Sequence, residues 1–408
     1  MRLDPSEHAF LSAPDTRAVL DAISPGETDR ARIVGGAVRN ALQGAPVEDV
    51  DIATQLTPQE TMDALKAAGI KAIPTGLDHG TITAVIKGKP FEITTLRKDV
   101  STDGRRAVVA FTTDWAIDAS RRDFRLNAIY ARRDGSLFDP YDGVADALAH
   151  RVIFIGEADE RLAEDVLRIL RFYRFNAWYG SALDPEGHAA CVRAAPGLKA
   201  LARERVWKEL KTLLAAPDPG PVVKAMQEGH VFEPVWPERL DLNLLLSIIN
   251  ADRGKGRAPD TLIRAAALCG GDVTTVRSLG HQMKASNAET DRLIAMCAPA
   301  ADGADSVRPG AEARARRRAL YTLGAQTFSD RMRLAEARGE GEADADLDAA
   351  AHWRKPDLPV TGRDLIALGF EPGPQLGAVM KQLEARWIDS DFNLDHETLL
   401  ARAAEAKG

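Results

Sequence analysis

The sequence predicts an α+β protein with a mixed α/β amino-terminal part followed by an all-helical remainder. Between residues 31 and 140, short β-branched apolar runs alternate with glycine-bearing turns and short helical segments. From about residue 160 onward the β signal fades, and Ala, Leu, Arg and Glu recur with helical periodicity. A chain of 408 residues also exceeds one ordinary hydrophobic core, so we expect several domains.

Strands and helices are expected in the following order. Strands are predicted at residues 33–34, 50–52, 81–86, 91–96 and 137–138, and helical segments at 38–43, 58–68 and 127–131. Thr57 is the expected cap of the helix over 58–68, with Pro58 in its first turn. The expected division is a lead-in at 1–30, a head at 31–150, a neck at 151–215, a body at 216–338, and an acidic connector with a helical tail at 339–408.

Bulk composition narrows the class of protein. With 45% hydrophobic and 28% charged residues, the chain has the composition of a soluble globular protein. It has no apolar run long enough to span a bilayer and its start lacks the pattern of a signal peptide, so a cytoplasmic location and no membrane partner are expected. Cys191, Cys269 and Cys297 form no C-x-x-C pair, which argues against a disulfide framework or a cysteine-rich zinc site.

Charge is unevenly distributed. The net charge of −7 argues against a uniformly basic nucleic-acid binder. Arginines nevertheless cluster between residues 97 and 174, so any nucleic acid is expected to bind a confined basic surface.

A short apolar strand runs into a double glycine at Gly35 and Gly36, after which a helix begins. Such a turn exposes backbone N–H groups that can bind phosphate. Residues 47–52 then alternate apolar and acidic side chains, so a strand there would place Asp49 and Asp51 on one face. Neighbouring carboxylates repel unless cations lie between them, and magnesium bridging to nucleotide phosphates is the usual reason for such a pair beside a phosphate-binding turn.

Either half of this pattern alone has a plainer explanation, a solvated strand face or an ordinary turn. Their succession in one strand, turn, helix and strand unit favours function. The chain contains no G-x-x-x-x-G-K-[ST] loop, and this segment is not G-x-G-x-x-G.

Residues 161–174 are predicted to form one amphipathic helix. One half of its helical wheel is charged and consists of Arg161, Glu164, Asp165, Arg168, Arg171 and Arg174. A solvated face is the ordinary explanation. An aspartate and an arginine one turn apart can, however, match the edge of C or A, because the carboxylate accepts from an exocyclic amine and the arginine donates to ring acceptors. Further arginines on the same face suit phosphates.

Five motifs in order resemble those of the class II tRNA nucleotidyltransferases. They are Gly-Gly-Ala-Val-Arg at 35–39, Asp-Val-Asp at 49–51, Arg-Arg-Asp-Phe-Arg-Leu-Asn-Ala at 121–128, Asp-Pro-Tyr-Asp-Gly at 139–143 and Glu-Asp-Val-Leu-Arg-Ile-Leu-Arg at 164–171. This family of the polymerase-beta-like superfamily contains the CCA-adding enzymes and the bacterial poly(A) polymerases. The resemblance implies a nucleotidyltransferase head followed by a helical neck, body and tail, with tRNA, CTP and ATP as partners and no DNA.

The resemblance also implies residue roles. Asp49 and Asp51 would hold Mg²⁺, with Glu92 as a third catalytic carboxylate. The residues implied in nucleotide binding are Gly35, Gly36 and Arg39 at the phosphates, Arg122, Asp123 and Asn127 at the ribose and phosphates, Asp165 and Arg168 at the base edge, and Arg171 and Arg174 near the triphosphate or the tRNA backbone.

The chain departs from the family pattern at three positions. Asn40 follows Val-Arg where the family usually has Asp, so a role that needs a charge there is in doubt. Arg125 stands where Thr is common, and Val166 where Pro is common.

Three features favour template-independent CCA addition or repair over poly(A) synthesis. Residues 74–81 resemble the CCA-adding type, the chain lacks a long basic tail, and residues 98–113 resemble a flexible loop of full CCA enzymes. That loop carries Asp103, Arg105 and Arg106. A bacterial poly(A) polymerase stays an alternative. A non-catalytic RNA-binding relative is a weaker one, because both metal carboxylates are present.

Overall fold

The computed structural model describes residues 1–102, 107–236, 240–298 and 308–405. The chain divides into two compact units, Met1–Pro237 and Glu238–Gly408. The finer division into head, neck, body and tail stays a prediction. Within the described residues, every helix is too short or too polar to cross a membrane.

The first unit is built around a mixed sheet in the order β3-β4-β5-β2-β1-β8-β9. Its strands are β1 Ala31–Val34, β2 Asp51–Thr54, β3 Lys71–Gly76, β4 Thr81–Ile86, β5 Lys89–Thr95, β8 Tyr130–Ala131 and β9 Leu137–Phe138. Strand β1 is fully buried and pairs antiparallel with β2 and β8, whereas β2 pairs parallel with β5. This register places Asp51 between Val34 of β1 and Glu92 of β5. A separate hairpin is formed by β6 Arg97–Thr102 and β7 Ala107–Phe111.

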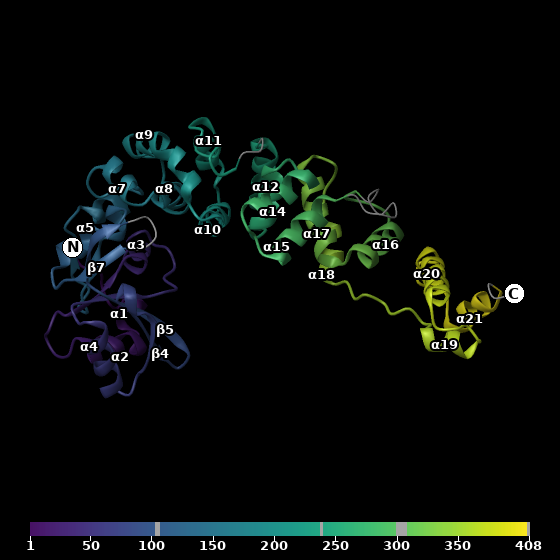
Figure 1. Ribbon diagram of the computed structural model, residues 1–408, viewed down its shortest axis with the longest axis horizontal. Helices are drawn as coiled ribbons and strands as arrows, with labels where there is room; N and C mark the ends of the chain where they lie inside the picture. The colour runs from purple at the N-terminus through teal and green to yellow at the C-terminus, as the bar shows by residue number, and fades with distance from the viewer. Residues whose placement is uncertain (103–106, 237–239, 299–307, 406–408) are drawn as a thin grey trace. The chain divides into compact units, whose positions relative to one another are not determined.

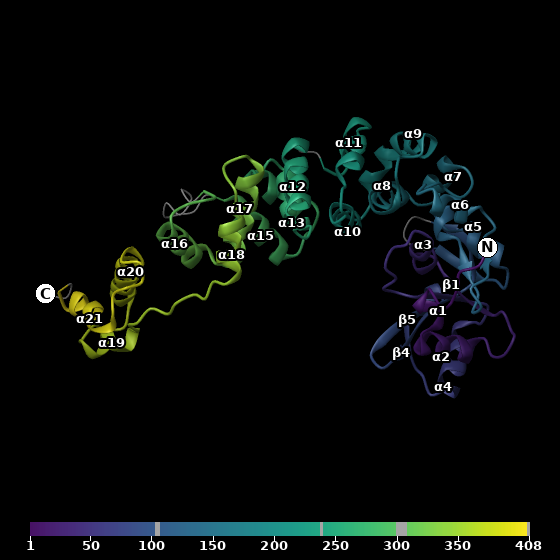
Figure 2. The same cartoon turned by 180° about the vertical axis from the view of Figure 1, so that it is seen from behind.

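Helices pack against this sheet, and in the described residues of the first unit after β9 the only regular elements are helical. The helices are α1 Ala9–Ser12, α2 Pro14–Ile23, α3 Gly36–Leu42, α4 Pro58–Ala67, α5 Trp115–Ser120, α6 Gly143–Leu148, α7 Ala158–Glu164, α8 Leu167–Tyr179, α9 Pro185–Ala194, α10 Arg203–Leu214 and α11 Gly220–Glu228. Helices α2 and α4 pack against each other, and they contact β1 and the β3–β4 pair respectively (Figures 1 and 2). Helix α8 packs mainly on α10, which follows it in sequence.

The predicted helix over 58–68 is confirmed as α4. Thr57 accepts a hydrogen bond from the Glu60 N–H at 3.3 Å, and the Glu60 side chain accepts one from the Thr57 N–H at 2.8 Å. This reciprocal cap satisfies two backbone donors that the first turn would otherwise leave without partners.

Two local predictions are wrong. Residues 127–131 do not form a helix, because a 3₁₀ turn over Arg125–Asn127 is followed by β8, whose Tyr130 is fully buried beside β1. Strand β2 begins at Asp51, so Asp49 precedes the strand, and strand alternation does not place the two carboxylates on one face. Pairing with β1 outweighs the local pattern at Tyr130, and β2 begins opposite Val34, the last residue of β1.

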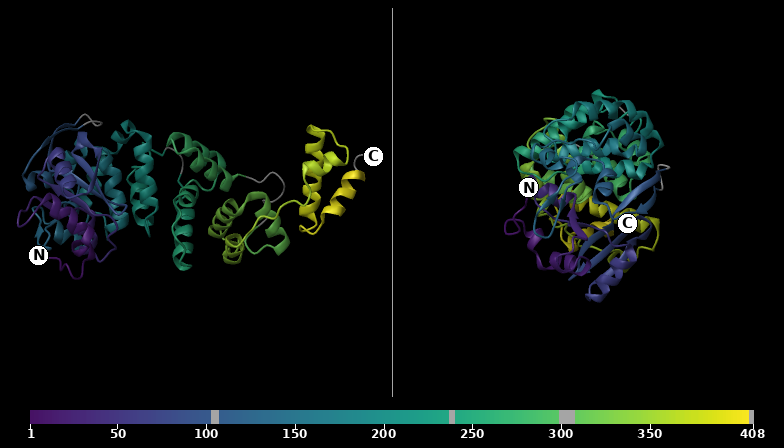
Figure 3. Two further views of the ribbon diagram at one scale, coloured as in Figure 1. Left: turned by 90° about the horizontal axis from the view of Figure 1, so that it is seen from below. Right: turned by 90° about the vertical axis from the view of Figure 1, so that its left-hand side faces the viewer.

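In the described residues the second unit is entirely helical. Its helices are α12 Leu242–Gly254, α13 Thr261–Leu268, α14 Val273–Gln282, α15 Asn287–Cys297, α16 Ala313–Leu323, α17 Ala325–Ala337, α18 Asp344–Ala351, α19 Gly362–Ala367, α20 Pro374–Asp389 and α21 His396–Glu405. Helices α19, α20 and α21 gather into one cluster near the carboxyl end (Figure 3). Tyr321 of α16 contributes to their core and packs edge-on against Trp387 at 5.7 Å.

Candidate active site

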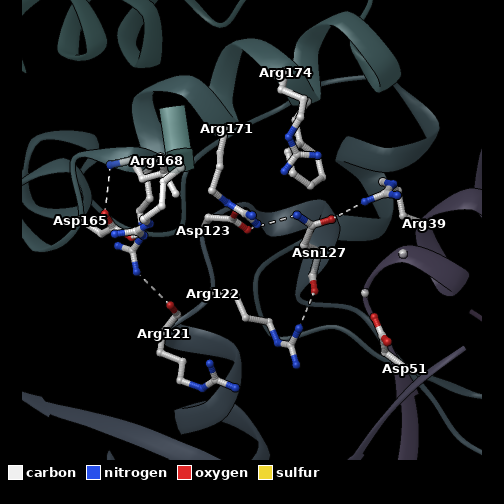
Figure 4. Close-up of a pocket in the computed structure, with 15 residues that line it drawn as sticks. Arg39, Asp51, Arg121, Arg122, Asp123, Asn127, Asp165, Arg168, Arg171 and Arg174 are labelled. Atoms are coloured by element: carbon white, nitrogen blue, oxygen red, sulfur yellow. Dashed lines mark hydrogen bonds and ion pairs between the residues drawn. The ribbon is translucent and has the colours of Figure 1, made fainter. Parts of the chain in front are cut away.

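A cavity of about 510 Å³ lies in the first unit between the glycine turn, the 121–127 segment and helix α8 (Figure 4). All the site residues predicted from the sequence line it except Asp49 and Glu92. The lining residues are Gly35, Gly36, Arg39, Asp51, Arg121, Arg122, Asp123, Asn127, Asp165, Leu167, Arg168, Arg171, Arg174, Phe175 and Arg205. Seven arginines face only three aspartates, so the cavity carries an excess of positive charge and suits an anion such as a triphosphate.

The glycine turn, Gly35 and Gly36, contributes backbone to the lining of the cavity. Strand β1 ends at Val34, and Gly35 takes a φ of 71°, a left-handed conformation that side chains rarely adopt. A Cβ on Gly35 would lie 3.8 Å from both Arg122 Nη1 and the Asn127 carbonyl oxygen. The backbone therefore turns sharply at this point, beside two other lining residues.

The carboxylates cluster at the start of β2. Asp51 lies at the first position of the strand, opposite Glu92. Partial loss of hydration raises the pKa of Asp51, and the nearby charges of Glu92 and Asp49 raise it further, while Arg122 opposes the shift. A divalent cation would relieve this repulsion, so the donor set fits a metal.

No group of three or more His, Cys, Asp or Glu side chains within the described ranges is arranged to hold a metal ion. Two carboxylates completed by substrate phosphate oxygens and water are the usual way in which Mg²⁺ is bound at phosphoryl-transfer sites. The role of Glu92 as a third carboxylate stays a prediction.

A continuous chain of hydrogen bonds crosses the cavity from α8 to α3 (Figure 4). Arg171 donates to Asp123 Oδ2 at 2.7 Å, Asn127 donates to Asp123 Oδ1 at 3.1 Å, and Arg39 donates to Asn127 Oδ1 at 2.6 Å. Burial alone would raise the pKa of Asp123, but the charge of Arg171 and the hydrogen bond from Asn127 lower it, so the carboxylate is ionised. These contacts hold the side chains of three separate segments in one arrangement.

The guanidinium of Arg122 is held by an ion pair and a hydrogen bond to residues that do not line the cavity. Its Nη2 lies 3.2 Å from Asp118 Oδ2, and its Nε donates to the Tyr130 hydroxyl at 3.1 Å. Asp118 is buried and also pairs with Arg121 at 2.7 Å. Burial would raise the pKa of Asp118, but Arg122 and Arg121 lower it, so Asp118 acts as a buried anion that orients two arginines.

The prediction of one continuous helix over residues 161–174 is wrong. Helix α7 ends at Glu164, Asp165 is extended with φ −149° and ψ 105°, and α8 begins at Leu167. Asp165 Oδ1 accepts from the Leu167 N–H at 3.0 Å and so supports the start of α8. Its Oδ2 lies 3.4 Å from Arg205 of α10. The break places Asp165 on the cavity wall together with Arg168.

The arginines of α8 are paired and do not form a freely solvated stripe. Arg168 donates to Glu164 Oε2 at 2.6 Å and to two carbonyl oxygens, those of Arg161 at 3.0 Å and Arg121 at 3.2 Å. Arg174 donates to Glu209 Oε2 at 2.5 Å. Held in this way, the guanidinium groups are oriented before any ligand binds, which reduces the cost of ordering them.

Four lining residues were not predicted as site residues: Arg121, Leu167, Phe175 and Arg205. Phe175 follows Arg171 and Arg174 on α8, and the guanidinium carbon of Arg174 lies 4.4 Å from its ring centroid. The spacing of Phe175 from Arg171 by one turn could have indicated it. Arg205 comes from another helix, 40 residues beyond Asp165, and no local sequence pattern connects the two.

The predicted flexible loop falls partly outside the described residues. Asp103, Arg105 and Arg106 lie in the gap between 102 and 107, where the structure gives no description. Backbone on either side of this gap pairs as β6 and β7.

Three family models match the chain in order. They are described as "Poly A polymerase head domain" over residues 31–153, "Probable RNA and SrmB- binding site of polymerase A" over 182–242, and "tRNA nucleotidyltransferase domain 2" over 265–403. The first of these covers the glycine turn, the carboxylates and the 121–127 segment.

Curated relatives match over almost the whole chain. The CCA tRNA nucleotidyltransferase 1, mitochondrial, of Mus musculus is 32% identical over 415 residues, which cover 98% of this chain and 92% of the relative. The CCA-adding enzyme of Limosilactobacillus fermentum is 30% identical over 394 residues, with 92% of each chain covered.

Solved structures show the same fold. The CCA-adding enzyme of Bacillus stearothermophilus in complex with CTP is 25% identical and covers 97% of this chain and 98% of its own, with a TM-score of 0.77. The Thermotoga maritima CCA-adding enzyme complexed with tRNA is 17% identical, with a TM-score of 0.65 over 100% of this chain and 99% of its own. With full-length relatives at 30% identity or more, this chain belongs to the CCA tRNA nucleotidyltransferase family.

Proposed function

We propose that this protein adds or repairs the 3′-terminal CCA of tRNA, using CTP and ATP without a nucleic-acid template. One observation carries the proposal: a single cavity combines arginines for a triphosphate, an aspartate–arginine pair for a base edge, and a carboxylate for a metal. The relatives that match over most of the chain are CCA enzymes, and structural neighbours include complexes with CTP and with tRNA.

Poly(A) synthesis is the second candidate, because one family model is named for the poly(A) polymerase head. That model covers only residues 31–153, whereas the curated relatives at 30% identity or more span over nine-tenths of this chain and are CCA enzymes. The comparison therefore favours CCA addition.

Asp49 and Asp51 are the proposed ligands of two Mg²⁺ ions, with Glu92 as the third catalytic carboxylate. The family to which the chain belongs depends on divalent metal in general, and Mg²⁺ is the specific proposal. When bound, the metal would neutralise charge on the triphosphate and favour ionisation of the tRNA 3′-hydroxyl. The raised pKa of Asp51 supports this assignment, since crowded carboxylates are stabilised by a cation.

The arginine-rich wall of the cavity is proposed to bind the nucleotide. Arg39, Arg171 and Arg174 would contact the phosphates together with the backbone of Gly35 and Gly36, and they are already oriented by hydrogen bonds to protein. Arg122, Asp123 and Asn127 would contact ribose and phosphates. Because their ion pairs and hydrogen bonds fix these groups before the nucleotide arrives, binding would cost little side-chain entropy.

Asp165 and Arg168 are proposed to replace a template base. Both line the cavity, but they bond to other residues, Asp165 to Arg205 and Arg168 to Glu164. Each would offer its remaining donors and acceptors to the edge of C or A. The helical second unit is proposed to hold the tRNA. The cytoplasmic location expected from the sequence stays a prediction, because some named relatives are mitochondrial.

Primer choice tests the proposal against poly(A) synthesis. Purified protein would be given ATP alone with an oligo(A) primer and, separately, CTP and ATP with tRNA that ends at the discriminator base. We expect poor extension of oligo(A) and rapid extension of the tRNA by three nucleotides. Long A tails on oligo(A), with no CTP incorporated into the tRNA, would establish the poly(A) polymerase instead.

A further inference from the structure

Arg39 differs from every other arginine of the cavity in the charge of its partners. The remaining lining arginines each form an ion pair with a carboxylate, namely Arg121 and Arg122 with Asp118, Arg168 with Glu164, Arg171 with Asp123, Arg174 with Glu209 and Arg205 with Asp165. Arg39 forms no ion pair with any residue in the described part of the chain. Its side-chain hydrogen bonds go to two neutral amides, those of Asn40 and Asn127.

Asn40 contacts Arg39 with one atom and a distant backbone group with the other. Its Oδ1 accepts from Arg39 Nε at 3.2 Å and from Nη2 at 2.9 Å, which fixes the plane of the guanidinium. Its Nδ2 donates to the Pro46 carbonyl oxygen at 2.8 Å. Pro46 lies in the segment that leads to Asp49 and Asp51, so one amide connects Arg39 with the approach to the carboxylates. A carboxylate at position 40 could not donate to Pro46.

Arg39 is held as a buried cation. Only 5% of its surface is exposed, and its guanidinium carbon lies 3.7 Å from the centroid of the Tyr179 ring. Burial lowers its pKa to about 10, so the group is still protonated at neutral pH. Asp123 attracts Arg39 but forms no ion pair with it. A buried charge without a directly paired opposite charge is energetically costly, and an anion that enters the cavity reduces this cost.

Resting on the proposed function, we propose that Asn40 is a positioning residue that orients Arg39 without neutralising it, which reserves the charge of Arg39 for the phosphates of the nucleotide. The ion-paired arginines then orient the nucleotide, while Arg39 provides an attraction that no protein carboxylate neutralises directly. The departure from Asp at position 40 would thus strengthen nucleotide binding through charge.

The Asn40→Asp variant tests this inference, because it keeps the acceptor and the shape of the side chain but adds a charge beside Arg39, at the loss of the hydrogen bond to Pro46. Affinities for CTP and CMP would be measured by titration in the presence of Mg²⁺, together with KM and kcat for addition to tRNA. We expect CTP affinity to fall about tenfold and CMP affinity to change much less, because the lost attraction grows with phosphate charge. KM for CTP should rise as the CTP affinity falls, while kcat stays within about twofold.

Two further variants separate charge from structure. Asn40→Ala removes both contacts but adds no charge, so it should weaken CTP binding by less than Asn40→Asp does. Gln59→Glu adds the same charge on the exposed face of α4 and should leave both affinities unchanged.

The inference is overturned if Asn40→Asp binds CTP as the wild type does, or if it weakens CTP and CMP equally. An Asn40→Ala variant that binds CTP as tightly as the wild type would also contradict it, because Asn40 would then not position Arg39, and this measurement remains available if the Asp variant unfolds. Because binding is measured independently of transfer, a wild-type protein that binds CTP but extends no tRNA would count against the proposed function and not against the role of Asn40.

Discussion

Arg171 of helix α8 donates a hydrogen bond from Nε to Asp123 Oδ2 at 2.7 Å, and its Nη2 lies 2.5 Å from the same oxygen in an ion pair. Asp123 is 8% exposed and lies 48 residues earlier, in the segment between α5 and the 3₁₀ turn at Arg125–Asn127. The pair therefore joins helix α8, which follows the sheet in sequence, to the sheet-bearing part of the unit. It closes one side of the proposed nucleotide cavity and begins the hydrogen-bond chain that ends at Arg39.

Replacing Asp123 by Asn should destabilise the protein, because an amide nitrogen facing Arg171 would leave the arginine without its counter-charge. We expect the free energy of unfolding of the first unit to fall by about 3 kcal/mol, the lower end for a broken buried pair, since Arg171 is partly exposed. Urea denaturation of Asp123→Asn, Arg171→Met and the double variant would measure the coupling. Additive effects of the two single substitutions would show that the pair is not a stabilising unit.

Asp51→Asn should abolish nucleotide transfer while leaving the fold intact. The substitution keeps the shape of the side chain but removes a metal ligand, so we expect the rate of CTP incorporation to fall by about a thousandfold or more. Asp63→Asn, on the exposed surface of α4, is the matched control and should keep full activity. A folded Asp51→Asn protein that retains substantial transfer would disprove the proposed metal site.

Substituting the base-reading residues should affect nucleotide choice more than rate. In Asp165→Ala or Arg168→Ala, we expect discrimination of CTP and ATP against UTP and GTP to weaken by about 1–3 kcal/mol, the value of a bidentate base contact. Competition assays with nucleotide pairs would measure this. Glu164→Gln keeps Arg168 but removes its ion pair, and should cost less selectivity. Slower transfer with unchanged selectivity in both Ala variants would contradict the template role.

In the second unit, Glu336 links stability to pH. Burial alone would raise its pKa, but hydrogen bonds from Arg257, the Ala343 N–H and Lys255 lower the pKa from 4.5 to about 2. A lowered pKa means that the ionised group stabilises the fold above pH 4.5, and that this stability is lost as the pH falls from 4.5 toward 2.

Glu336→Gln should therefore lower the free energy of unfolding at pH 7 by up to about 3 kcal/mol, with a much smaller difference from the wild type near pH 2. Denaturant titrations across this range would test the expectation. Glu397→Gln, on the exposed start of α21, serves as the control. An equal loss of stability at both pH values would indicate a role for Glu336 that does not depend on its charge.

Much of the first unit could be predicted from local sequence. The start of helix α4 is specified within four residues by Thr57, Pro58 and Glu60. The turn at Gly35 is indicated by the apolar run that precedes it. Strand β8 could not be predicted in this way, because Tyr130 is drawn into the sheet by β1, almost 100 residues earlier. Local propensity predicts secondary structure poorly where a large side chain is buried by pairing with a distant strand.

The candidate site shows the same limit. Motif residues predicted most of the cavity lining, but their partners come from distant segments. The break at Asp165 lies within an uninterrupted helical pattern and depends on a side chain that bonds to the Leu167 N–H. Arg205 and Glu209 reach Asp165 and Arg174 from α10, and only the folded chain brings them together. Helical periodicity identifies a charged face but not which charges are paired.

Sequencing of tRNA 3′ ends tests the central claim most directly. tRNA transcripts that end at the discriminator base would be incubated with CTP, ATP and Mg²⁺, together with either the wild-type protein or Asp51→Asn, and their 3′ ends then read. The account predicts that the wild type adds C, C and A in that order and stops, whereas Asp51→Asn leaves the ends unchanged. Unextended ends or open-ended A tails with the wild type, or complete CCA with Asp51→Asn, would contradict it.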